Sequence, residues 1–295
     1  MQKVAFIINP ASGIGRKILL EKRLNRFFHA QNGWEATIYH TTCADDAFEA
    51  AQNYKEQQFD LVVAVGGDGT VNKVAHALVH SSVPMGIIPT GSGNGLARHL
   101  KIPLSVKKAI EVILKGKVTT IDSGEINGQP FFCTAGIGFD ANLAHRFNRA
   151  PVRGFPSYLA LSALEYIHYQ PDRYSICIGD TKIEREAFLI TFANCAQWGN
   201  NVYIAPDASA TDGLLDMVIW KKSPIIDIPL IATRLIMKNI DHSHKIEIIK
   251  GAFFRIMRLY EGLVHFDGEP VQMGRELNVA VYPGSLQVVT PCSYQ

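Results

Sequence analysis

A short, wholly apolar run that is followed at once by glycines most constrains the fold of this chain. Residues 61–65 read Leu-Val-Val-Ala-Val, and Gly66, Gly67, Asp68 and Gly69 come directly after them. A strand that is apolar on both faces belongs inside a parallel sheet that helices cover on both sides. The run therefore predicts an α/β fold, in which the glycines turn the chain from this strand into the next helix.

The first 120 residues repeat this alternation of strand and helix. Further strands are predicted at residues 4–8, 34–39 and 85–88, and helices at 16–31, 45–57, up to about 79, and near 95–100. Alternation of this kind is typical of a parallel sheet with helices on both faces.

After about residue 120 closely spaced strands replace the alternation. They are predicted at residues 119–126, 130–134, 174–178, 182–192, 215–220, 245–249, 253–259, 264–266, 278–282 and 286–290, with helices at 154–169 and 224–240. This pattern predicts an antiparallel sandwich or barrel. We therefore expect an α/β domain over residues 1–122, joined by residues 284–295, and a β-rich domain over residues 123–283.

Composition excludes a disordered chain, a collagen and a coiled coil. The chain has 295 residues, 47% of them hydrophobic, and 29 basic against 27 acidic residues give a net charge of +2. Such a balance is typical of a globular protein and does not favour nucleic acid as a partner. Five scattered cysteines without a C-x-x-C pair indicate reduced thiols. No apolar run approaches the roughly 20 residues of a membrane span, and the N-terminal run is short for a secretory signal. We expect a cytoplasmic protein.

Three glycine-rich turns follow predicted strands of the first domain, at residues 9–13, 66–70 and 91–95. In an open parallel sheet, ligands bind at the carboxyl ends of the strands. Glycine allows a phosphate to approach bare backbone amides, and the helix that follows adds its positive end. One such turn can simply end a strand, whereas three together predict a phosphate or nucleotide site.

Other nucleotide motifs fit poorly. The chain contains no G-x-x-x-x-G-K-[ST] sequence, which excludes a P-loop protein. Residues 136–141 (GIGFDA) fit G-x-G-x-x-A only loosely, and no acidic residue is clearly placed about 20 positions further on. We interpret this segment as structural, or as lining a cleft.

Two acidic segments are candidates for proton transfer or metal binding. In HFDGEPV (265–271), Asp267 and Glu269 stand two residues apart and could act together, although this segment taken alone favours an ordinary Asp-Gly hairpin turn. The segment from Ala210 to Asp216 fits either a hairpin or a metal loop. His76 and His80 are spaced like a ligand pair, but no third ligand is evident.

One predicted helix is apolar on much of its circumference. Residues 223–240 (SPIIDIPLIATRLIMKNI) fit a core helix, or alternatively a rim that helps a lipid leave a bilayer. Arg146, Arg149 and Arg153 could meet anionic headgroups or simply face solvent.

Taken in order, the motifs resemble those of the diacylglycerol kinase catalytic-domain family, which includes bacterial lipid kinases and sphingosine kinases. The resemblance covers nearly the whole chain and rests on NPASG (9–13), GGDGTVN (66–72), PTGSGNGLAR (89–98), GIGFDA (136–141), the segment 194–216 and FDGE (266–269). NAD kinases and 6-phosphofructokinases share GGDGT, but FDGE and DGLLD point away from them.

The resemblance implies an NAD kinase-like α/β domain that binds ATP, a β-rich sandwich domain, and an active site in the cleft between them. The residues implied around ATP are Asn9, Pro10, Ala11, Ser12, Gly13, Thr41, Gly66, Gly67, Asp68, Gly69, Thr70, Val71, Asn72 and Ser92. Asp68 would organise the phosphates through Mg²⁺, and Asp267 and Glu269 would supply the catalytic base and its support. A second, structural Mg²⁺ would bind the Asp212 side chain and the carbonyls of Ser209 and Leu214.

The function implied is transfer of the γ-phosphate of ATP to a lipid hydroxyl, on diacylglycerol, a sphingoid base or a related lipid. Three departures from the family pattern, Lys73, Gly95 and Trp198, bear on the acceptor rather than the chemistry. The alternatives are phosphorylation of a soluble acceptor, as in NAD kinases, and a silent nucleotide-binding protein. The resemblance further implies transient contact with a membrane surface that carries the lipid substrate, and it leaves a homodimer open.

Overall fold

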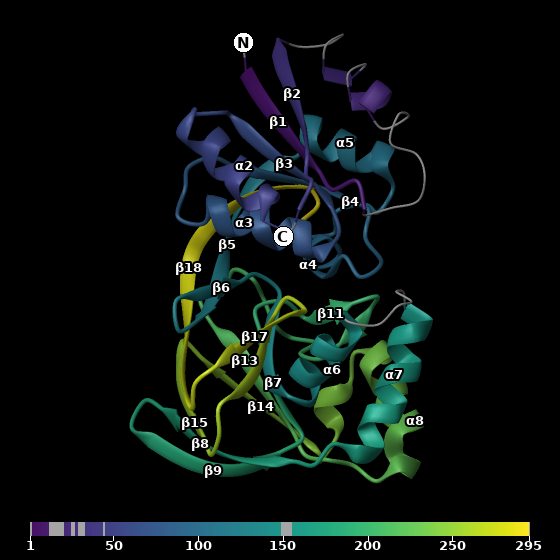
Figure 1. The fold of residues 1–295 in the computed structure, drawn as a ribbon, viewed down its shortest axis with the longest axis vertical. Helices are drawn as coiled ribbons and strands as arrows, with labels where there is room; N and C mark the ends of the chain where they lie inside the picture. Colours follow the sequence, from purple (N-terminus) through teal and green to yellow (C-terminus); the bar gives the residue numbers. More distant parts are fainter. Residues whose placement is uncertain are drawn as a thin grey trace. The chain divides into compact units, whose positions relative to one another are not determined.

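The computed structural model describes residues 2–11, 21–24, 27–28, 33–43, 45–148 and 155–294. The chain divides into two compact units, Met1–Ile121 with Gly284–Gln295, and Asp122–Pro283. The first unit is the predicted α/β domain and the second is the predicted β-rich domain (Figure 1). The predicted helix at residues 16–31 falls largely outside the described residues.

The first unit is built on a parallel sheet. Its strands are β1 (Gln2–Ile8), β2 (Trp34–His40), β3 (Leu61–Gly66), β4 (Met85–Pro89) and the end of β18 (Glu276–Thr290), in the order β2-β1-β3-β4-β18. The neighbouring pairs β1–β2, β1–β3, β3–β4 and β4–β18 are all parallel. Every residue of β3 is buried, as its apolar sequence predicts.

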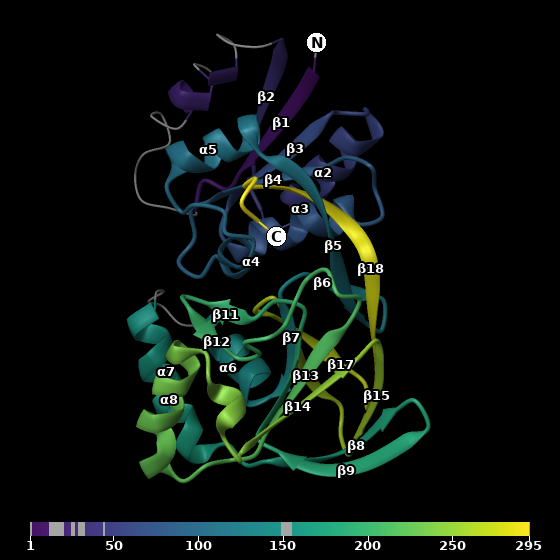
Figure 2. The ribbon, with the colours of Figure 1, turned by 180° about the vertical axis from the view of Figure 1, so that it is seen from behind.

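Helices pack against this sheet. They are α2 (Asp46–Glu56), α3 (Asp68–Leu78), α4 (Gly95–His99) and α5 (Val106–Lys115). Helices α2 and α3 pack side by side, and α5 packs against β4 (Figures 1 and 2). Gly86 lies where a Cβ atom would come within 3.3 Å of Ile113 of α5, so the absence of a side chain allows this helix to sit close to the sheet. The sequence patterns did not predict α5.

The second unit contains an antiparallel sandwich. One sheet has the order β14-β13-β10-β7-β16-β17, with strands Ile246–Gly251, Leu215–Trp220, Leu189–Ala193, Thr134–Gly138, Gly262–Phe266 and Glu269–Met273. The other has the order β18-β15-β8-β9, with Phe253–Arg258, Asp172–Ile178 and Thr181–Ala187 beside the first part of β18. Strand β5 (Lys117–Ile126) pairs with β18 and with β6 (Gln129–Phe131), and β11 (Gln197–Gly199) and β12 (Val202–Tyr203) form a small ribbon.

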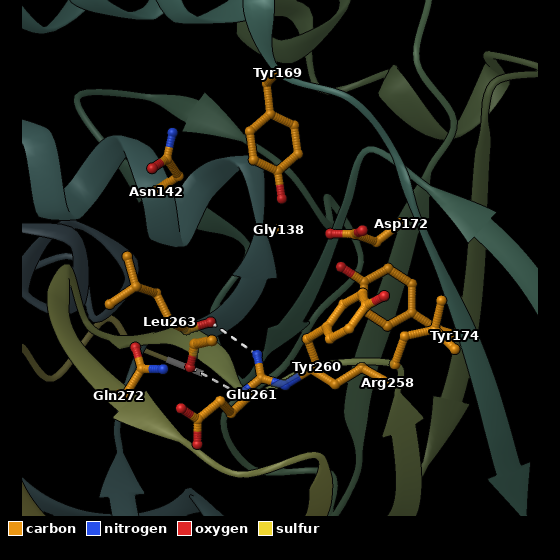
Figure 3. Close-up of a pocket in the computed structure, with 12 residues that line it drawn as sticks. Gly138, Asn142, Tyr169, Asp172, Tyr174, Arg258, Tyr260, Glu261, Leu263 and Gln272 are labelled. Carbon is orange, nitrogen blue, oxygen red and sulfur yellow. Dashed lines mark hydrogen bonds between the residues drawn. The ribbon is translucent and has the colours of Figure 1, made fainter.

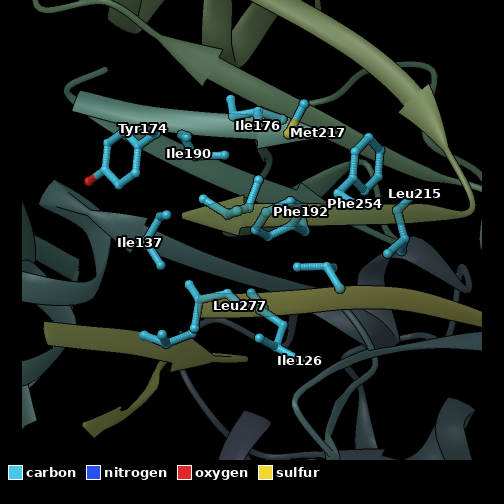
Figure 4. Close-up of a cluster of buried hydrophobic side chains, with 14 of the residues drawn as sticks. Ile126, Ile137, Tyr174, Ile176, Ile190, Phe192, Leu215, Met217, Phe254 and Leu277 are labelled. Carbon is cyan, nitrogen blue, oxygen red and sulfur yellow. The ribbon is translucent and has the colours of Figure 1, made fainter. Parts of the chain in front are cut away.

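The core of this sandwich lies between its sheets. Ile137, Ile190, Phe192 and Met217 come from the first sheet and meet side chains of the second, among them Phe254 (Figure 4). The opposite face of the six-stranded sheet carries α6 (Phe139–Asn148), α7 (Phe155–His168) and α8 (Ile228–Met237), together with the 3₁₀ turns Ile225–Asp227 and Ile240–His242. Because both faces are covered, β10 and β13 are buried at every residue.

Several predicted strands have different limits in the structure. The strand predicted at 130–134 is interrupted at Phe132 and Cys133, which separate β6 from β7. The strand predicted at 182–192 divides at Phe188 into β9 and β10, which belong to different sheets. The strands predicted at 278–282 and 286–290 form one continuous strand, β18. Apolar patterning shows which residues are buried but not which sheet buries them, and this explains these errors.

Candidate active site

The three glycine turns of the first unit lie at the carboxyl ends of adjacent parallel strands. Asn9 follows β1 and its amide donates to the Val65 carbonyl at 3.0 Å, while the Thr90 amide after β4 donates to the Gly66 carbonyl at 2.8 Å. These two bonds join the ends of β1, β3 and β4. The Asn9 side chain also donates to Thr70 Oγ1 at 3.1 Å and accepts from the Ala11 amide at 2.9 Å. Ser12 and Gly13 lie outside the described residues.

The second turn is a direct entry into α3. Gly66 ends β3, Gly67 precedes the helix, and α3 begins at Asp68, so the amides of its first turn point towards the end of the sheet. A Cβ atom on Gly66 would collide with the Thr70 side chain, and one on Gly67 would lie 3.2 Å from the Cα atom of Gly91. Glycine is therefore required here by the close approach of two backbone turns.

Asp68 ties the second turn to the third. Its carboxylate oxygens accept the amide of Asn94 at 2.8 Å and the amide of Gly95 at 2.7 Å. Asn94 has a positive φ of 52° and is buried, and its side chain donates to the Gly91 carbonyl at 2.7 Å and accepts from the Gly91 amide at 3.1 Å. Ser92 is exposed at the tip of the same turn. The turn over residues 91–95 is thus fixed from both sides.

The remaining residues predicted around the nucleotide surround this edge of the sheet. Thr41 follows β2, is buried, and its amide donates to the Ile8 carbonyl at 3.0 Å. Val71 and Asn72 are buried in the first part of α3. Lys73, which departs from the family pattern, makes an ion pair with Asp45 at 2.9 Å and so connects α3 with the residue before α2.

In the second unit, Asp267 occupies a tight hairpin turn. Phe266 pairs with Glu269 across β16 and β17, so Asp267 and Gly268 alone form the loop, and both have positive φ values, of 49° and 91°. This geometry fits a two-residue primed turn, in which Asp-Gly is favoured. The hairpin alternative raised from the sequence therefore describes the backbone at this segment.

The side chain of Asp267 has a role beyond the turn. Its Oδ1 atom accepts the amides of Cys133 at 2.8 Å and Thr134 at 2.9 Å, and its Oδ2 atom accepts the amide of Phe132 at 3.0 Å. The interruption between β6 and β7 thus presents three consecutive amides to one carboxylate. Charge-assisted bonds of this kind fix both the position and the orientation of the group. Glu269, at the start of β17, is exposed.

A buried polar network lies beside this hairpin, and sequence reasoning missed it. Asp140 Oδ2 accepts from Thr191 Oγ1 at 2.8 Å and lies 3.1 Å from His265 Nε2, and all three side chains are buried. The Gly268 amide donates to His265 Nδ1 at 3.4 Å, which links the network to the hairpin turn. Because Nδ1 accepts a hydrogen bond, the neutral imidazole carries its proton on Nε2, and Nε2–H donates to Asp140 Oδ2.

The one sequence signal for this network was Gly136. A Cβ atom at this position would collide with Asp140 Oδ2 and would lie 2.9 Å from His265 Nε2. The GIGFDA motif has a structural role: its first glycine leaves room for the network, and the second, Gly138, has a φ of 92° where β7 passes into α6. Gly138 also lines a cavity, as the second alternative from the sequence expected.

At the segment predicted to hold a structural Mg²⁺, the structure places the ammonium group of Lys250. Asp212 Oδ1 accepts the Leu214 amide at 3.1 Å, and the Lys250 ammonium lies 3.4 Å from Asp212 Oδ2 and 3.2 Å from Asp216 Oδ2. Lys250 also donates to the Asp207 carbonyl at 3.2 Å. The side-chain hydroxyl of Ser209 lies 3.2 Å from Thr211 Oγ1. The carboxylates are the oxygen ligands that Mg²⁺ prefers, but the Lys250 ammonium already offsets one of their two negative charges.

Burial affects the charges of this cluster. Asp216 is buried, and desolvation raises the pKa of its carboxyl group although Lys250 opposes the shift. The neighbouring carboxylates raise the pKa of Lys250 against the opposing effect of desolvation. Within the described part of the chain, no group of three or more His, Cys, Asp or Glu side chains is arranged to hold a metal ion. A metal at Ser209, Asp212 and Leu214 stays a prediction that this arrangement does not favour.

A separate cavity of about 290 Å³ lies in the second unit, lined by Tyr169, Asp172, Tyr174 and Arg258 among others (Figure 3). Arg258 is buried and donates to the carbonyls of Gly262, Leu263, Met273 and Gly274 at 2.7–3.1 Å. These carbonyls belong to the open end of the β16–β17 hairpin, whereas Asp267 is at its closed end. Arg258 therefore anchors the hairpin, and the cavity is distinct from the predicted base.

Comparison with known proteins assigns both halves of the chain. Residues 3–126 match the diacylglycerol kinase catalytic domain, and residues 133–290 match the YegS C-terminal NAD kinase beta sandwich-like domain. The diacylglycerol kinase of Bacillus subtilis is 32% identical, over 95% of this chain and 97% of its own length. The protein named Probable lipid kinase YegS from Escherichia coli O17:K52:H18 is 27% identical, over 93% of this chain and 90% of its own length.

A solved structure shares the fold. The crystal structure of a diacylglycerol kinase from Bacillus anthracis has a TM-score of 0.78 at 22% identity and covers 100% of this chain and 98% of its own. The chain belongs to the diacylglycerol kinase catalytic-domain family, a family of lipid kinases, as the sequence motifs indicated. It is accordingly an enzyme, a phosphotransferase that uses an alcohol group as the acceptor.

Proposed function

We propose that this protein is an ATP- and Mg²⁺-dependent lipid kinase that transfers the γ-phosphate to a hydroxyl group of diacylglycerol or a closely related lipid. The observation that carries the proposal is the set of three linked turns at the carboxyl ends of β1, β3 and β4. The acceptor is suggested by the relative in Bacillus subtilis, which is named diacylglycerol kinase and is similar over nearly the whole chain.

The turns are suited to a polyphosphate. At Gly67 and Gly91 the two backbones approach so closely that no side chain intervenes. Backbone amides and the positive end of α3 can then face the phosphate oxygens directly. Such donors are fixed before the reaction, so they stabilise the charge of the transferring phosphoryl group without reorganising.

Asp68 is the residue that fits Mg²⁺ in the first unit. Its two carboxylate oxygens are held in place by the amides of Asn94 and Gly95, and carboxylate oxygens are ligands that Mg²⁺ prefers. A Mg²⁺ ion bound with the nucleotide supplies neutralisation of the phosphate charge. Asp68 would hold that ion and so orient the phosphates relative to α3.

Asp267 is proposed as the base that accepts the proton of the lipid hydroxyl. A general base must be held in a fixed orientation, and the amides of Phe132, Cys133 and Thr134 provide this for Asp267. Glu269 is exposed on the next strand, and we assign it a supporting role.

Label transfer tests the proposal. The protein is incubated with a total lipid extract, Mg²⁺ and ATP labelled at either the γ- or the α-phosphate, and the lipids are separated by thin-layer chromatography. We expect γ-label, but not α-label, in a lipid spot that migrates as phosphatidate, and loss of the spot with EDTA. A parallel reaction contains NAD in place of lipid, and label in NAD but not in lipid would assign a soluble acceptor. Binding of ATP without label transfer to either acceptor would indicate a nucleotide-binding protein.

A further inference from the structure

Large apolar side chains are exposed together on two neighbouring helices of the second unit. Ile226 is 86% exposed and Met237 is 68% exposed, whereas core residues of the sandwich such as Phe254 are fully buried. Figures 1 and 2 both show α7 and α8 side by side at the edge of this unit. We call the following set the apolar helix surface: Leu164, Ile167, Ile225, Ile226, Leu230, Ile236 and Met237.

The inner side of α8 is already packed. Ile231 and Leu235 are buried in a cluster with Tyr166 of α7, and the Tyr166 hydroxyl donates to the Ser223 carbonyl at 2.6 Å. Helix α8 is thus apolar on its packed side and on its outer side, where Leu230 and Met237 lie two turns apart. A helix that is apolar all round is normally covered on every side. The exposed apolar side of α8 is therefore expected to bind an apolar partner.

The charges around this surface indicate which partner it fits. Between Lys221 and Lys245 the chain has five Lys and Arg residues and two Asp residues, a net charge of +3, while the whole chain has +2. The rest of the molecule therefore carries a net charge of −1, so the segment that contains α8 is more basic than the rest of the chain. Apolar side chains flanked by Lys and Arg are typical of segments that lie in the interface of an anionic membrane.

We propose that the apolar helix surface docks on the surface of an anionic phospholipid bilayer, with Ile226, Leu230 and Met237 in the interface and Arg234 and Lys238 against the headgroups. The proposal rests on the proposed function, since a lipid kinase must meet its acceptor where that acceptor resides. None of the helices in the described parts of the chain is long and apolar enough to span a bilayer. The docking proposed here needs only side-chain insertion.

Co-sedimentation with sucrose-loaded vesicles tests the docking. Vesicles of phosphatidylcholine alone are compared with vesicles that also contain phosphatidylglycerol. We expect the wild type to bind the mixed vesicles. The double variant Ile226→Asp, Met237→Asp should bind them with an affinity at least about tenfold lower. The matched control is Leu104→Asp with Val118→Asp, which places the same two charges at exposed apolar residues of the first unit and should bind as the wild type does.

A second pair of substitutions tests the charge. Arg234→Gln with Lys238→Asn removes two positive charges, and asparagine suits the positive φ of 59° at position 238. This variant should lose most of its preference for phosphatidylglycerol and keep its weaker binding to phosphatidylcholine. Equal binding of the wild type and the Ile226, Met237 variant to both kinds of vesicle would overturn the proposal, as would a wild type that binds neither.

Two further readings separate docking from the proposed function and from self-association. With a short-chain diacylglycerol in true solution, the Ile226, Met237 variant should phosphorylate as fast as the wild type. Vesicle binding by a wild type that phosphorylates no lipid would contradict the proposed function and leave docking supported. Light scattering that shows a wild-type dimer and a monomeric variant would assign the surface to a second copy of the chain and overturn membrane docking.

Discussion

Asp140 shows how one buried carboxylate can control a turn that it does not belong to. It accepts from Thr191 and His265, and the other nitrogen of His265 accepts from the Gly268 amide beside Asp267. None of these links is visible as a spacing in the sequence, because the residues come from α6, β10 and β16. The glycine at position 136 is the one residue whose type could have indicated a close approach here.

We expect Asp140→Asn to weaken this arrangement. In either orientation the new amide would point its NH₂ group at another donor, either at Thr191 Oγ1–H and His265 Nε2–H or at the backbone amide of Ala141. The other histidine tautomer would place a proton on Nδ1, against the Gly268 amide. The free energy of unfolding should fall by about 1–3 kcal/mol, measured by urea denaturation, and phosphate transfer should slow. Thr191→Val, which removes one donor only, is the control and should lose less stability. Equal stability of Asp140→Asn and the wild type would contradict the network.

His99 at the end of α4 makes stability depend on pH. Burial, with a smaller effect of Lys101, lowers the pKa of His99 from 6.5 to about 4. As the pH falls, His99 is therefore protonated near pH 6.5 in the unfolded chain but only near pH 4 in the folded chain. The folded state loses stability as the pH falls through this window. The loss is at most about 3 kcal/mol.

The substitution His99→Gln should remove this contribution. Unfolding free energies of the wild type and the variant, measured by urea denaturation at pH 7 and pH 4.5, should show a smaller loss in the variant. An identical loss in both proteins would show that His99 is not the group responsible.

At the scale of elements, the turn over residues 91–95 depends on the conformation and the side chain of Asn94 together. Its positive φ of 52° disfavours alanine, and its amide group makes two bonds to Gly91. We expect Asn94→Ala to be less stable than the wild type by about 1–3 kcal/mol and to bind ATP more weakly. Asn94→Gly restores the conformation but not the bonds, so its loss should be smaller.

Calorimetric titration with ATP and thermal melting measure both effects of the Asn94 substitutions. If the alanine and glycine variants were equally stable, the backbone conformation would not contribute, and the explanation of this turn would fail.

The sequence predicted elements well where one physical signal dominated. The buried run at 61–65 identified the parallel sheet, and the glycines after it identified the edge that binds ligands in such folds. It predicted poorly where tertiary pairing decides the limits. Phe132 and Cys133 read as part of a strand, yet they leave the ladder, and their amides bond to Asp267, more than 130 residues further along the chain. Side-chain patterns do not record where backbone amides are satisfied.

For the whole molecule, metal removal should affect activity and stability differently. We propose that the reaction needs Mg²⁺, whereas the carboxylates of Asp212 and Asp216 are already paired with the Lys250 ammonium, which offsets one of their two negative charges. EDTA should therefore abolish phosphate transfer and leave the melting temperature unchanged. A lower melting temperature in EDTA would indicate a structural metal and contradict the role of Lys250.

Lys250→Met provides the complementary test. Loss of the ammonium leaves the buried carboxylate of Asp216 without its partner. Because Lys250 is partly exposed, the expected loss is only about 1 kcal/mol. Added Mg²⁺ or Ca²⁺ should raise the melting temperature of this variant but not of the wild type, and an equal response of both proteins would count against the cluster as described.

The central proposal is that this lipid kinase binds its nucleotide at the linked turns of the first unit and uses Asp267 of the second unit as its base. Its most direct test is the rate of phosphatidate formation from ATP and diacylglycerol in mixed micelles, for the wild type, Asp267→Asn and Glu269→Gln, with folding checked by thermal melting. We predict product with the wild type, a loss of about 10²–10⁴-fold in Asp267→Asn, and a smaller loss in Glu269→Gln. A folded Asp267→Asn protein that forms phosphatidate at the wild-type rate would contradict the account.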